Sequence, residues 1–343
     1  MAKIVFYCND TKHNIDAFEY YKQDIDAFRR LGHDVIICTR YIEIPFQFDL
    51  MFVWWWTYAL FPVLFSRLLG RPVIVTGTFN FRFPPELGDG DYFSRPFWQR
   101  VLIKIPTILA TRNFFVNMSE FEGCSSYFRL NNSRYLPHVI ADDYLIGPST
   151  DRELSIFNLA WSGKKNLIRK GVPDLVKAIS LLRDEFPNIK LNLAGHEGDG
   201  AGYLSELIKS FGLENNVNCL GALSRERKIS LLRASEIYAQ PSHFEGFGLA
   251  IAESMGSGAC VVTCDVGAVK SVVGDCGIYV PPGSPEELAK ALRTVLLNEG
   301  VRKHYQKCAH ERAISNFSMQ SKIDRLRKYL SELGITSEGE ASE

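Results

Sequence analysis

Short apolar segments of strand length alternate with longer segments of helical spacing along most of the chain, and this alternation limits the possible folds most strongly. It is typical of parallel sheets whose connecting helices cover both faces. In the first half we expect strands at 4–8, 35–39, 50–54, 73–76 and 113–116, and helices at 18–31, 58–69, 96–111 and 119–129. In the second half we expect strands at 155–161, 190–194, 217–220, 236–239, 259–263 and 277–280, and helices at 172–185, 201–212, 224–234, 246–256, 285–298, 300–315 and 318–333. The fold class predicted from this alternation is α/β.

The length and one polar run indicate how this α/β chain is divided. Its 343 residues are enough for about two domains. The run Ile146–Asp151 is polar and rich in helix breakers, so we interpret it as a linker. We therefore predict an N-terminal domain at 1–147, a C-terminal domain at 148–317, a last helix at 318–334 and a disordered tail at 335–343.

Three local features of the first half carry expectations of their own. Pro106 should kink or break the helix at 96–111, because proline has no backbone N–H to donate. Ser119 and Glu122 have the spacing of a capping box. The loop at 77–95 is long for a compact domain, which favours a functional or mobile segment.

Charge and cysteine usage argue against several classes of function. The formal net charge is zero, so nothing indicates a nucleic-acid partner. None of the eight cysteines forms a C-x-x-C pair, so we expect reduced, buried thiols in a cytoplasmic protein and no zinc site. Met1 leads directly into the first strand, which predicts no signal peptide. Pro62 and Arg67 interrupt the apolar region 50–69, which favours a strand and a buried helix over a membrane span.

The stretch Gln240–Gly258 combines features that suit a nucleotide-sugar. Gly246 and Gly248 open a helix and let the backbone approach a ligand closely. The N–H groups of the first helical turn can hold a phosphate, helped by the helix dipole. Glu245 before the helix and Glu253 inside it could bind hydroxyls on either side of that phosphate. The alternative is an ordinary amphipathic helix behind a glycine loop.

The sequence around the two glutamates strongly resembles the E-x7-E motif of retaining GT-B glycosyltransferases of family 4. The matching letters are P-S, then E-G-F-G, then G-S-G. The resemblance implies two Rossmann-like, doubly wound domains facing across a cleft, a last helix that packs back on the N-terminal domain, and hexosyltransferase activity. It implies that Glu245 contacts the donor sugar and stabilises an oxocarbenium-like transition state, and that Glu253 binds the ribose. The diphosphate would bind the backbone amides of Phe247, Gly248 and Leu249.

Two lysines begin and end the loop after the strand at 155–161. Lys164 and Lys170 match the spacing of the basic residues that, in the resembling family, stabilise the departing diphosphate. Lysine at the first position keeps the charge of the family's more frequent arginine but not its bidentate fork. With two lysines and a helix end available, no metal ion or other cofactor is expected. A solvated basic loop, which also includes Lys165, is the alternative.

Further turns match the nucleotide site of the resembling family. Gly163 begins the lysine loop. His196 stands in a glycine turn that borders the nucleotide in the family, and it could equally be a surface-loop residue. Ala222 and Leu223 lie in a turn whose backbone reads the base in the family. The resemblance covers about residues 155–330.

The first half departs from the family pattern. The loop at 9–14 has no glycine pair, and Asn80 stands where many members have a histidine. Asn80 is a catalytic candidate that can hydrogen-bond a sugar hydroxyl but cannot take a proton at neutral pH. His13 is a candidate acceptor contact or an incidental loop residue. Asp89-Gly90-Asp91 looks like a metal-binding D-x-D motif, but its surroundings do not fit one, so no metal site is predicted there.

Aromatic residues crowd the first half and are interleaved with arginines. Aromatic faces stack on sugars and arginines bind phosphate, so Arg82 and Arg95 are candidate acceptor contacts. The stretch Pro96–Ile105 has the composition of an interfacial helix, which would suit a lipid-linked glycan acceptor at the inner face of the membrane. A core helix whose charged ends reach water explains the same residues.

The resemblance therefore predicts a metal-independent, retaining glycosyltransferase that moves a sugar from a nucleotide-diphospho-sugar to a glycan or lipid-linked glycan. One alternative, favoured by Asn80, is a non-catalytic GT-B partner subunit that binds a sugar nucleotide or a glycan. A second is a sugar-nucleotide epimerase or a phosphorylase of the same architecture.

Overall fold

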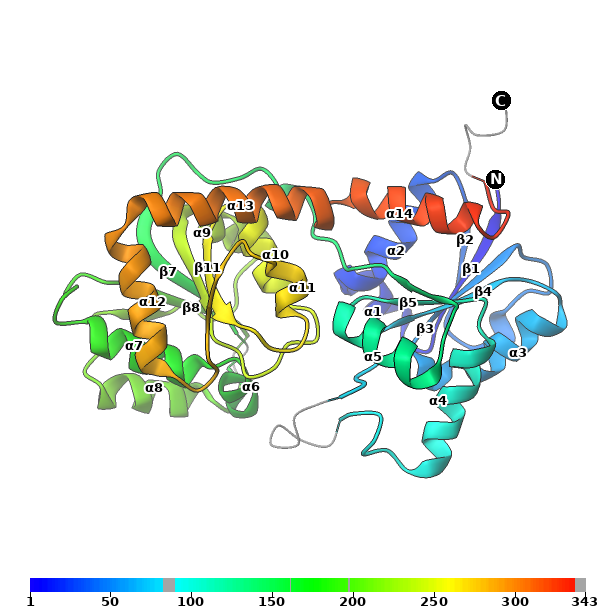
Figure 1. The fold of residues 1–343 in the computed structure, drawn as a ribbon, viewed down its shortest axis with the longest axis horizontal. Helices are drawn as coiled ribbons and strands as arrows, with labels where there is room; N and C mark the ends of the chain where they lie inside the picture. Colours follow the sequence, from blue (N-terminus) through cyan, green and yellow to red (C-terminus); the bar gives the residue numbers. More distant parts are fainter. Residues whose placement is uncertain (83–89, 161, 197, 337–343) are drawn as a thin grey trace. The chain divides into compact units, whose positions relative to one another are not determined.

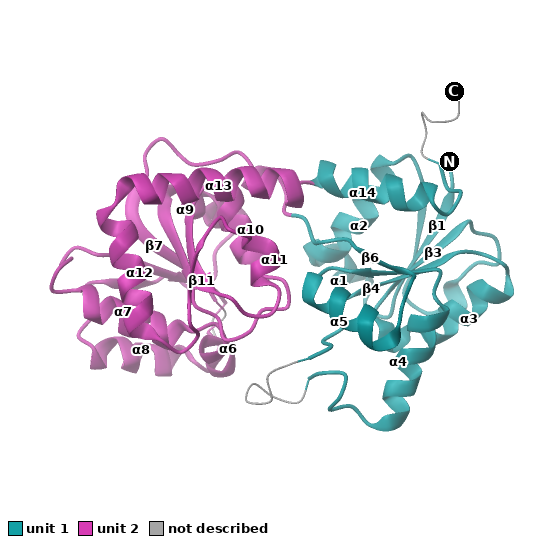
Figure 2. Cartoon of the chain, in the orientation of Figure 1, with its two compact units in different colours: residues 1–139, 319–343 teal, residues 140–318 magenta. Residues whose placement is uncertain are grey.

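The computed structural model describes residues 1–82, 90–160, 162–196 and 198–336, in two compact units (Figure 2). Unit 1 comprises Met1–Val139 and Met319–Glu343, and unit 2 comprises Ile140–Ser318. The run interpreted as a linker, Ile146–Asp151, lies within unit 2. There the Arg233 side chain donates a hydrogen bond to the Gly147 carbonyl at 2.8 Å.

Unit 1 is built on a six-stranded parallel sheet in the order β2-β1-β3-β4-β5-β6 (Figure 1). Its strands are β1 (Lys3–Cys8), β2 (Asp34–Cys38), β3 (Leu50–Trp54), β4 (Val73–Gly77), β5 (Arg112–Phe115) and β6 (Ser133–Tyr135). Its helices are α1 (Lys12–Ala17), α2 (Glu19–Arg30), α3 (Leu60–Leu68), α4 (Phe97–Leu109), α5 (Met118–Phe128) and α14 (Met319–Ser331), with 3-10 turns at Tyr41–Glu43 and Trp56–Tyr58. Every residue of β3 and β4 is buried, as expected for central strands covered on both faces.

Side chains of alternate strand residues enter two hydrophobic cores, one on each face of this sheet. One core joins Phe6 and Phe52 to α2 and α14, and the other joins Val5 and Val53 to α3, α4 and α5. The last helix is also held by a buried ion pair between Lys322 and Asp24. Burial raises the pKa of Asp24 and lowers that of Lys322, so the two charges depend on each other.

Unit 2 contains a second six-stranded parallel sheet, in the order β12-β11-β10-β7-β8-β9. Its strands are β7 (Glu153–Leu159), β8 (Leu191–Ala194), β9 (Val217–Cys219), β10 (Ser235–Gln240), β11 (Cys260–Cys264) and β12 (Ile278–Val280). Its helices are α6 (Lys164–Arg169), α7 (Val172–Leu182), α8 (Ala201–Ser210), α9 (Arg225–Ala234), α10 (Leu249–Gly256), α11 (Val269–Val273), α12 (Pro285–Leu297) and α13 (Glu299–Phe317), with a 3-10 turn at Asp142–Tyr144. One core packs α7, α8 and α12 on one face of the sheet, and another packs α9, α10, α11 and α13 on the other.

The predicted alternation of strands and helices is confirmed in both units. The elements that were not predicted, α1, β6, α6 and α11, have three to six residues each, too few to show a clear period. Trp161 at the end of one predicted strand and the predicted tail from 337 onward lie outside the described residues.

One predicted detail of unit 1 is wrong, and of the kink or break expected at Pro106 the break is excluded. The capping box at Ser119 is replaced by Asn117, whose side chain accepts hydrogen bonds from the N–H groups of Ser119 and Glu120, because α5 begins one residue earlier than expected. Helix α4 does not end at Pro106 but continues to Leu109. Among the described residues, no helix has both the length and the apolar character needed to cross a membrane.

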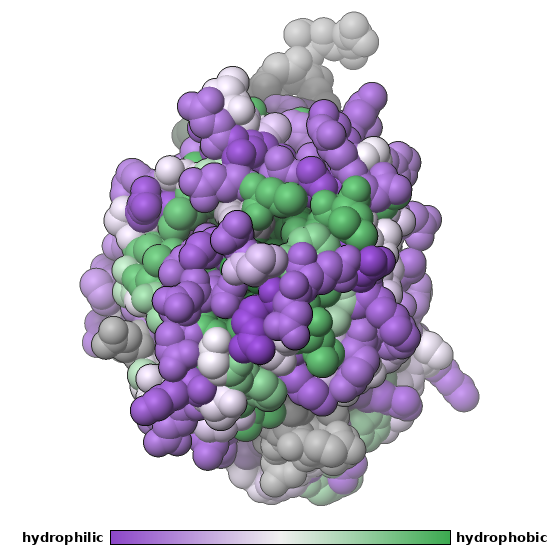
Figure 3. Space-filling model, turned by 90° about the vertical axis from the view of Figure 1, so that its left-hand side faces the viewer, coloured by the Kyte–Doolittle hydropathy of each residue, from purple (hydrophilic) through white to green (hydrophobic). Residues whose placement is uncertain are grey.

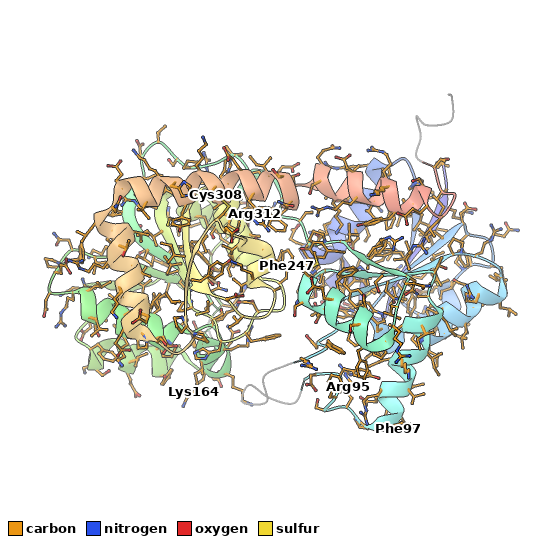
Figure 4. All side chains as sticks on the ribbon, in the orientation of Figure 1. Arg95, Phe97, Lys164, Phe247, Cys308 and Arg312 are labelled. Atoms are coloured by element: carbon orange, nitrogen blue, oxygen red, sulfur yellow. A yellow bond between two sulfur atoms is a disulfide. The ribbon has the colours of Figure 1, made fainter. Side chains whose placement is uncertain are left out.

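The expectation that all cysteines are reduced and buried is also wrong. Cys276 and Cys308 form a disulfide that ties the segment before β12 to α13 (Figure 4). The two are 32 residues apart, and only the packing of α13 brings them together. The other six cysteines are free thiols, of which Cys219 is exposed and five are buried.

Candidate functional site

The turn between β10 and α10 leads into a helix N-terminus, where backbone N–H groups can hold an anion. Gly248 precedes the helix with a φ of 94°, in the left-handed region that favours glycine. The N–H groups of the first turn of α10 have no acceptor inside the helix. Phe247 is buried and packs edge-on against Phe317, with ring centroids 5.8 Å apart, which fixes the turn to α13 (Figure 4).

Glu245 lies just before this turn and is buried, with 4% of its surface exposed. Its Oε1 atom accepts hydrogen bonds from Ser242 Oγ at 3.0 Å and Gln240 Nε2 at 2.5 Å, and it forms an ion pair with Lys170. A buried carboxylate needs such partners, because an isolated charge in the interior is costly. The sequence predicted Lys170 and Glu245 as site residues, and the structure brings them together. Gln240 and Ser242 were not predicted.

The segment that carries Lys170 is pressed against the β10–α10 turn. Gly171 has a φ of +68°, and a Cβ atom on it would lie 1.9 Å from the Pro241 carbonyl oxygen. The Arg169 carbonyl accepts from the His243 N–H at 2.8 Å, and the Arg169 guanidinium donates to the Phe244 carbonyl at 3.1 Å. Glycine at 171 and these two bonds therefore set the position of Lys170 beside Glu245.

Lys164 has a different environment from Lys170, at the other end of α6. Its side chain is exposed, and its Nζ atom lies 5.1 Å from the centroid of the Tyr203 ring. Its backbone N–H donates to Asp199 at 2.9 Å. Gly163, just before it, is the N-cap of α6. The two lysines are therefore not paired around one carboxylate: Lys170 is neutralised by Glu245, and Lys164 keeps its charge at the surface.

The glycine turn after β8 packs closely on the segment before α6. The Ser162 N–H donates to the His196 carbonyl at 2.9 Å, and the Gly200 N–H donates to the Ser162 carbonyl at 2.7 Å. A Cβ atom on Gly200 would lie 2.5 Å from the same carbonyl oxygen. His196 is exposed, and its carbonyl helps to shape the turn.

Glu253 lies on α10, and Lys228 on α9 contacts both of its carboxylate oxygens, at 3.0 and 3.1 Å. Burial raises the pKa of Glu253. Lys228 was not predicted, because nothing in the letters connects it with a residue on the next helix. Ala222 and Leu223 lie in the turn that leads into α9.

A cavity of about 390 Å³ lies within unit 2, beside the carboxyl ends of β7 and β8. Gly195, Gly221 and Ser162 border it, and side chains of α8, including Leu204, line its apolar part. The Oδ1 atom of buried Asn158 has no hydrogen-bond partner within the described part of the chain. The cavity therefore adjoins the turns that were predicted to border the nucleotide.

The remaining predicted residues lie in unit 1. Asn80 has a φ of 53°, which asparagine tolerates better than most residues, and its N–H donates to Glu120 Oε1 at 2.7 Å. Glu120 also accepts from the Phe79 N–H at 2.9 Å, and its burial raises its pKa to about 7. Glu120 was missed, because its partners are about forty residues away. The exposed His13 and Arg82 and the partly exposed Arg95 complete the predicted set.

Among the described residues, no group of three or more His, Cys, Asp or Glu side chains could hold a metal ion. Asp89 of the D-x-D sequence lies outside those residues.

Comparison with protein families identifies the region that contains the β10–α10 turn. Residues 164–312 match the model described as glycosyl transferases group 1. Residues 164–312 belong to this family. The match includes Lys164, Lys170, Glu245 and Glu253 and lies entirely in unit 2.

Relatives in the glycosyl transferases group 1 family match a similar part of the chain. The glycogen synthase of Mycobacterium tuberculosis is 29% identical over 154 residues, which are 44% of this chain and 37% of that protein. The phosphatidyl-myo-inositol mannosyltransferase of Mycolicibacterium smegmatis is 32% identical over 155 residues, or 44% of this chain and 39% of that protein. The chain thus matches less than half the length of these curated relatives.

A solved structure is similar over nearly the entire chain. Anabaena Alr3699/HepE in complex with UDP and glucose aligns with a TM-score of 0.75 at 17% identity, covering 97% of this chain and 100% of that chain. At this identity the similarity concerns the fold. The predicted fold class is confirmed: the two six-stranded parallel sheets, flanked by helices, are those of the GT-B fold.

Proposed function

We propose that this protein is a retaining glycosyltransferase that transfers a hexose from a nucleotide-diphospho-sugar to a glycan or lipid-linked glycan, without a metal ion. The observation that carries the proposal is the buried Glu245–Lys170 pair beside the N-terminus of α10. The family of residues 164–312 and the names of the relatives, a glycogen synthase and a mannosyltransferase, support it.

The geometry suggests how the donor would bind. The diphosphate would accept hydrogen bonds from the amides of Phe247, Gly248 and Leu249, where the helix dipole favours an anion. In the described part of the chain, all three side-chain donors to Glu245 reach its Oε1 atom. We therefore assign Oε2 to a hydroxyl of the donor sugar. A fixed carboxylate at that position would stabilise the positive charge that develops on the sugar as its bond to the diphosphate breaks.

Charge compensation would follow as the diphosphate leaves. Lys170 donates to Glu245 in the structure and would share a proton with the leaving phosphate oxygen, while Lys164 would screen the charge from the surface. Glu253 would bind the ribose hydroxyls, and Lys228 would keep that carboxylate ionised. The acceptor hydroxyl would attack on the face from which the diphosphate departs, with the phosphate taking its proton, so the anomeric configuration is retained.

The test is turnover of UDP-, GDP- and ADP-sugars with and without acceptor glycans, with NMR to read the anomeric configuration of the product. Glu245→Gln should keep nucleotide binding within a few fold and lower donor hydrolysis by about a hundredfold or more, the cost of removing one preorganised transition-state contact. Thermal shift measures binding separately, because a nucleotide at 100 times its Kd stabilises the folded state by about 2.7 kcal/mol. Hydrolysis equal to wild type in Glu245→Gln would refute the assignment.

One observation favours the second candidate, a non-catalytic sugar-nucleotide-binding subunit. Asn80, in place of the family's histidine, lies in a turn where the Phe79 and Asn80 N–H groups both donate to the Glu120 carboxylate, and an asparagine side chain cannot take a proton at neutral pH. Nucleotide binding without turnover of any donor, with acceptors present, would support this candidate. Asn80→His would then be the variant to examine for a gain of hydrolysis.

A further inference from the structure

Unit 1 exposes an apolar surface on two helices that contact each other, α3 and α4. We call it the α3–α4 face. Its exposed apolar residues are Phe61, Leu64 and Leu68 on α3 and Phe97, Trp98, Leu102 and Ile108 on α4. Leu68 is 84% exposed, Phe97 74% and Trp98 60%. Figure 4 marks Phe97 at the N-terminal end of α4, with Arg95 close by.

The polarity of α4 is the reverse of that expected for a helix on a water-facing surface. Its inner side buries Ile103, Pro106 and Thr107, and its outer side should then be polar. Instead the outer side carries aromatic and aliphatic side chains, with Lys104 among them. Figure 3 looks onto unit 2, where apolar patches lie among mostly hydrophilic residues.

The charge of this face is one-sided. The chain as a whole has zero formal net charge, yet the segments 54–82 and 92–119 contain no aspartate or glutamate. Both segments carry basic residues. Those on or beside the α3–α4 face that are exposed or partly exposed are Arg67, Arg95, Arg100 and Lys104. Such a face would repel a second copy of itself, and it is complementary to a negatively charged surface.

We propose that the α3–α4 face docks on an anionic lipid bilayer, with Phe97 and Trp98 in the interfacial layer and the basic residues at the headgroups. Aromatic and aliphatic side chains gain free energy by leaving water, and each basic residue gains more beside anionic lipid. The arrangement is that of a helix lying in the interface. Docking depends on unit 1 alone, so it can be tested without any transferase activity.

The experiment is cosedimentation of the full chain with vesicles of phosphatidylcholine alone and of phosphatidylcholine with phosphatidylglycerol. We expect binding at least about tenfold tighter to the anionic vesicles, weakening as salt is raised. The double variant Phe97→Ser/Trp98→Ser should lose binding, and Lys104→Gln should weaken it only for anionic vesicles. The matched control is Ile146→Ser/Leu297→Ser in unit 2, two apolar residues that are 64% and 57% exposed, which should bind like wild type.

Each alternative result would overturn the proposal. These results are no vesicle binding by the wild type, equal binding to both lipid compositions, or equal losses in the α4 variant and the unit 2 control. Sedimentation velocity without lipid tests a second copy as the occupant. A dimer that Phe97→Ser/Trp98→Ser converts to a monomer would replace the bilayer with a partner chain. Circular dichroism and nucleotide binding show that each variant is folded.

Discussion

Replacing Gly171 by alanine should damage the site through the backbone, without removing any group proposed to touch the donor. The new Cβ atom would lie 1.9 Å from the Pro241 carbonyl oxygen, whereas real Cβ contacts are essentially never below 3.0 Å. The α6–α7 turn or the β10–α10 turn must therefore move by at least 1.1 Å, the difference between these distances. Because Lys170 and Glu245 are carried by these two segments, their ion pair should be displaced.

The size of the effect can be separated into two parts. Alanine at a φ of +68° costs about 1 to 2 kcal/mol wherever it occurs. Overpacking against a fixed backbone adds about 1 to 3 kcal/mol more. Gly212→Ala in the same unit provides the control, since its φ is +64° and its Cβ atom would meet only the tip of the Arg183 side chain, at 3.3 Å. The free energy of unfolding should therefore fall by about 2 to 5 kcal/mol in Gly171→Ala and by about 1 to 2 kcal/mol in Gly212→Ala.

Urea unfolding and donor hydrolysis together test this reasoning. A misplacement of about 1 Å in a preorganised site can lower the rate about a hundredfold, so hydrolysis should fall strongly in Gly171→Ala and stay near wild type in Gly212→Ala. Equal losses of unfolding free energy in the two variants would mean that the α6–α7 and β10–α10 turns can move apart at no measurable cost. Loss of stability with full activity would mean that the Lys170–Glu245 geometry does not matter for turnover.

Three further predictions concern buried groups. Lys228→Met should lower the free energy of unfolding, measured in urea titrations, by about 2 to 4 kcal/mol at pH 8 and by less at pH 5. The reason is that Glu253, whose side chain is 15% exposed, loses its cationic partner and stays charged until it takes a proton. Burial lowers the pKa of His138 to about 3, so the neutral side chain contributes its full stabilisation above pH 6.5. The free energy of unfolding should fall by up to about 5 kcal/mol as the pH is lowered towards 3, and the pH dependence of unfolding in His138→Gln should lack this fall. Cys276→Ser opens a 32-residue loop and should lower the free energy of unfolding by about 3 to 4 kcal/mol. Adding reductant should lower the free energy of unfolding of the wild type to the value of the variant. An unchanged unfolding midpoint in Cys276→Ser would count against a stabilising role for the bond to Cys308.

The parts of the fold that the sequence predicted are those in which one segment carries the whole signal. The strand at 50–54 is uninterrupted in its apolar character, and the structure has β3 at Leu50–Trp54, buried at every residue. The turn from Gln240 to Leu249 was recognisable for the same reason, since a strand end, two glycines and a helix start follow one another in ten residues. At these places the residues of one short segment favour the same local structure that the complete fold requires.

The parts that could not be predicted depend on partners far away in the chain. Lys228 reaches Glu253 from a neighbouring helix, and Glu120 holds the turn at Asn80 from forty residues away. Neither pair has a characteristic spacing, because the distance along the chain between two helices, or between a loop and a helix, does not determine which faces meet. The same reason explains why a disulfide was not foreseen in a chain without C-x-x-C pairs.

The pairing of charges in unit 2 changes which lysine should hold the diphosphate most strongly. Lys170 is neutralised by Glu245 and Lys228 by Glu253, so these four side chains add no net positive charge to the site. We therefore expect the attraction for a diphosphate to come from the α10 N-terminus and from a lysine that has no carboxylate partner among the described residues, and Lys164 over Tyr203 is such a residue.

Lys164→Ala should therefore weaken binding of the nucleoside diphosphate that the donor panel identifies by about fivefold and make it less dependent on salt, the behaviour of one partly solvated charge. The neighbouring Lys165 is also exposed and lies on the same helix, so Lys165→Ala is the matched control and should bind the same nucleotide like wild type. Isothermal titration at two salt concentrations measures both. If the two variants lose affinity equally, the loop acts as a general basic patch, and Lys164 has no specific place in the donor site.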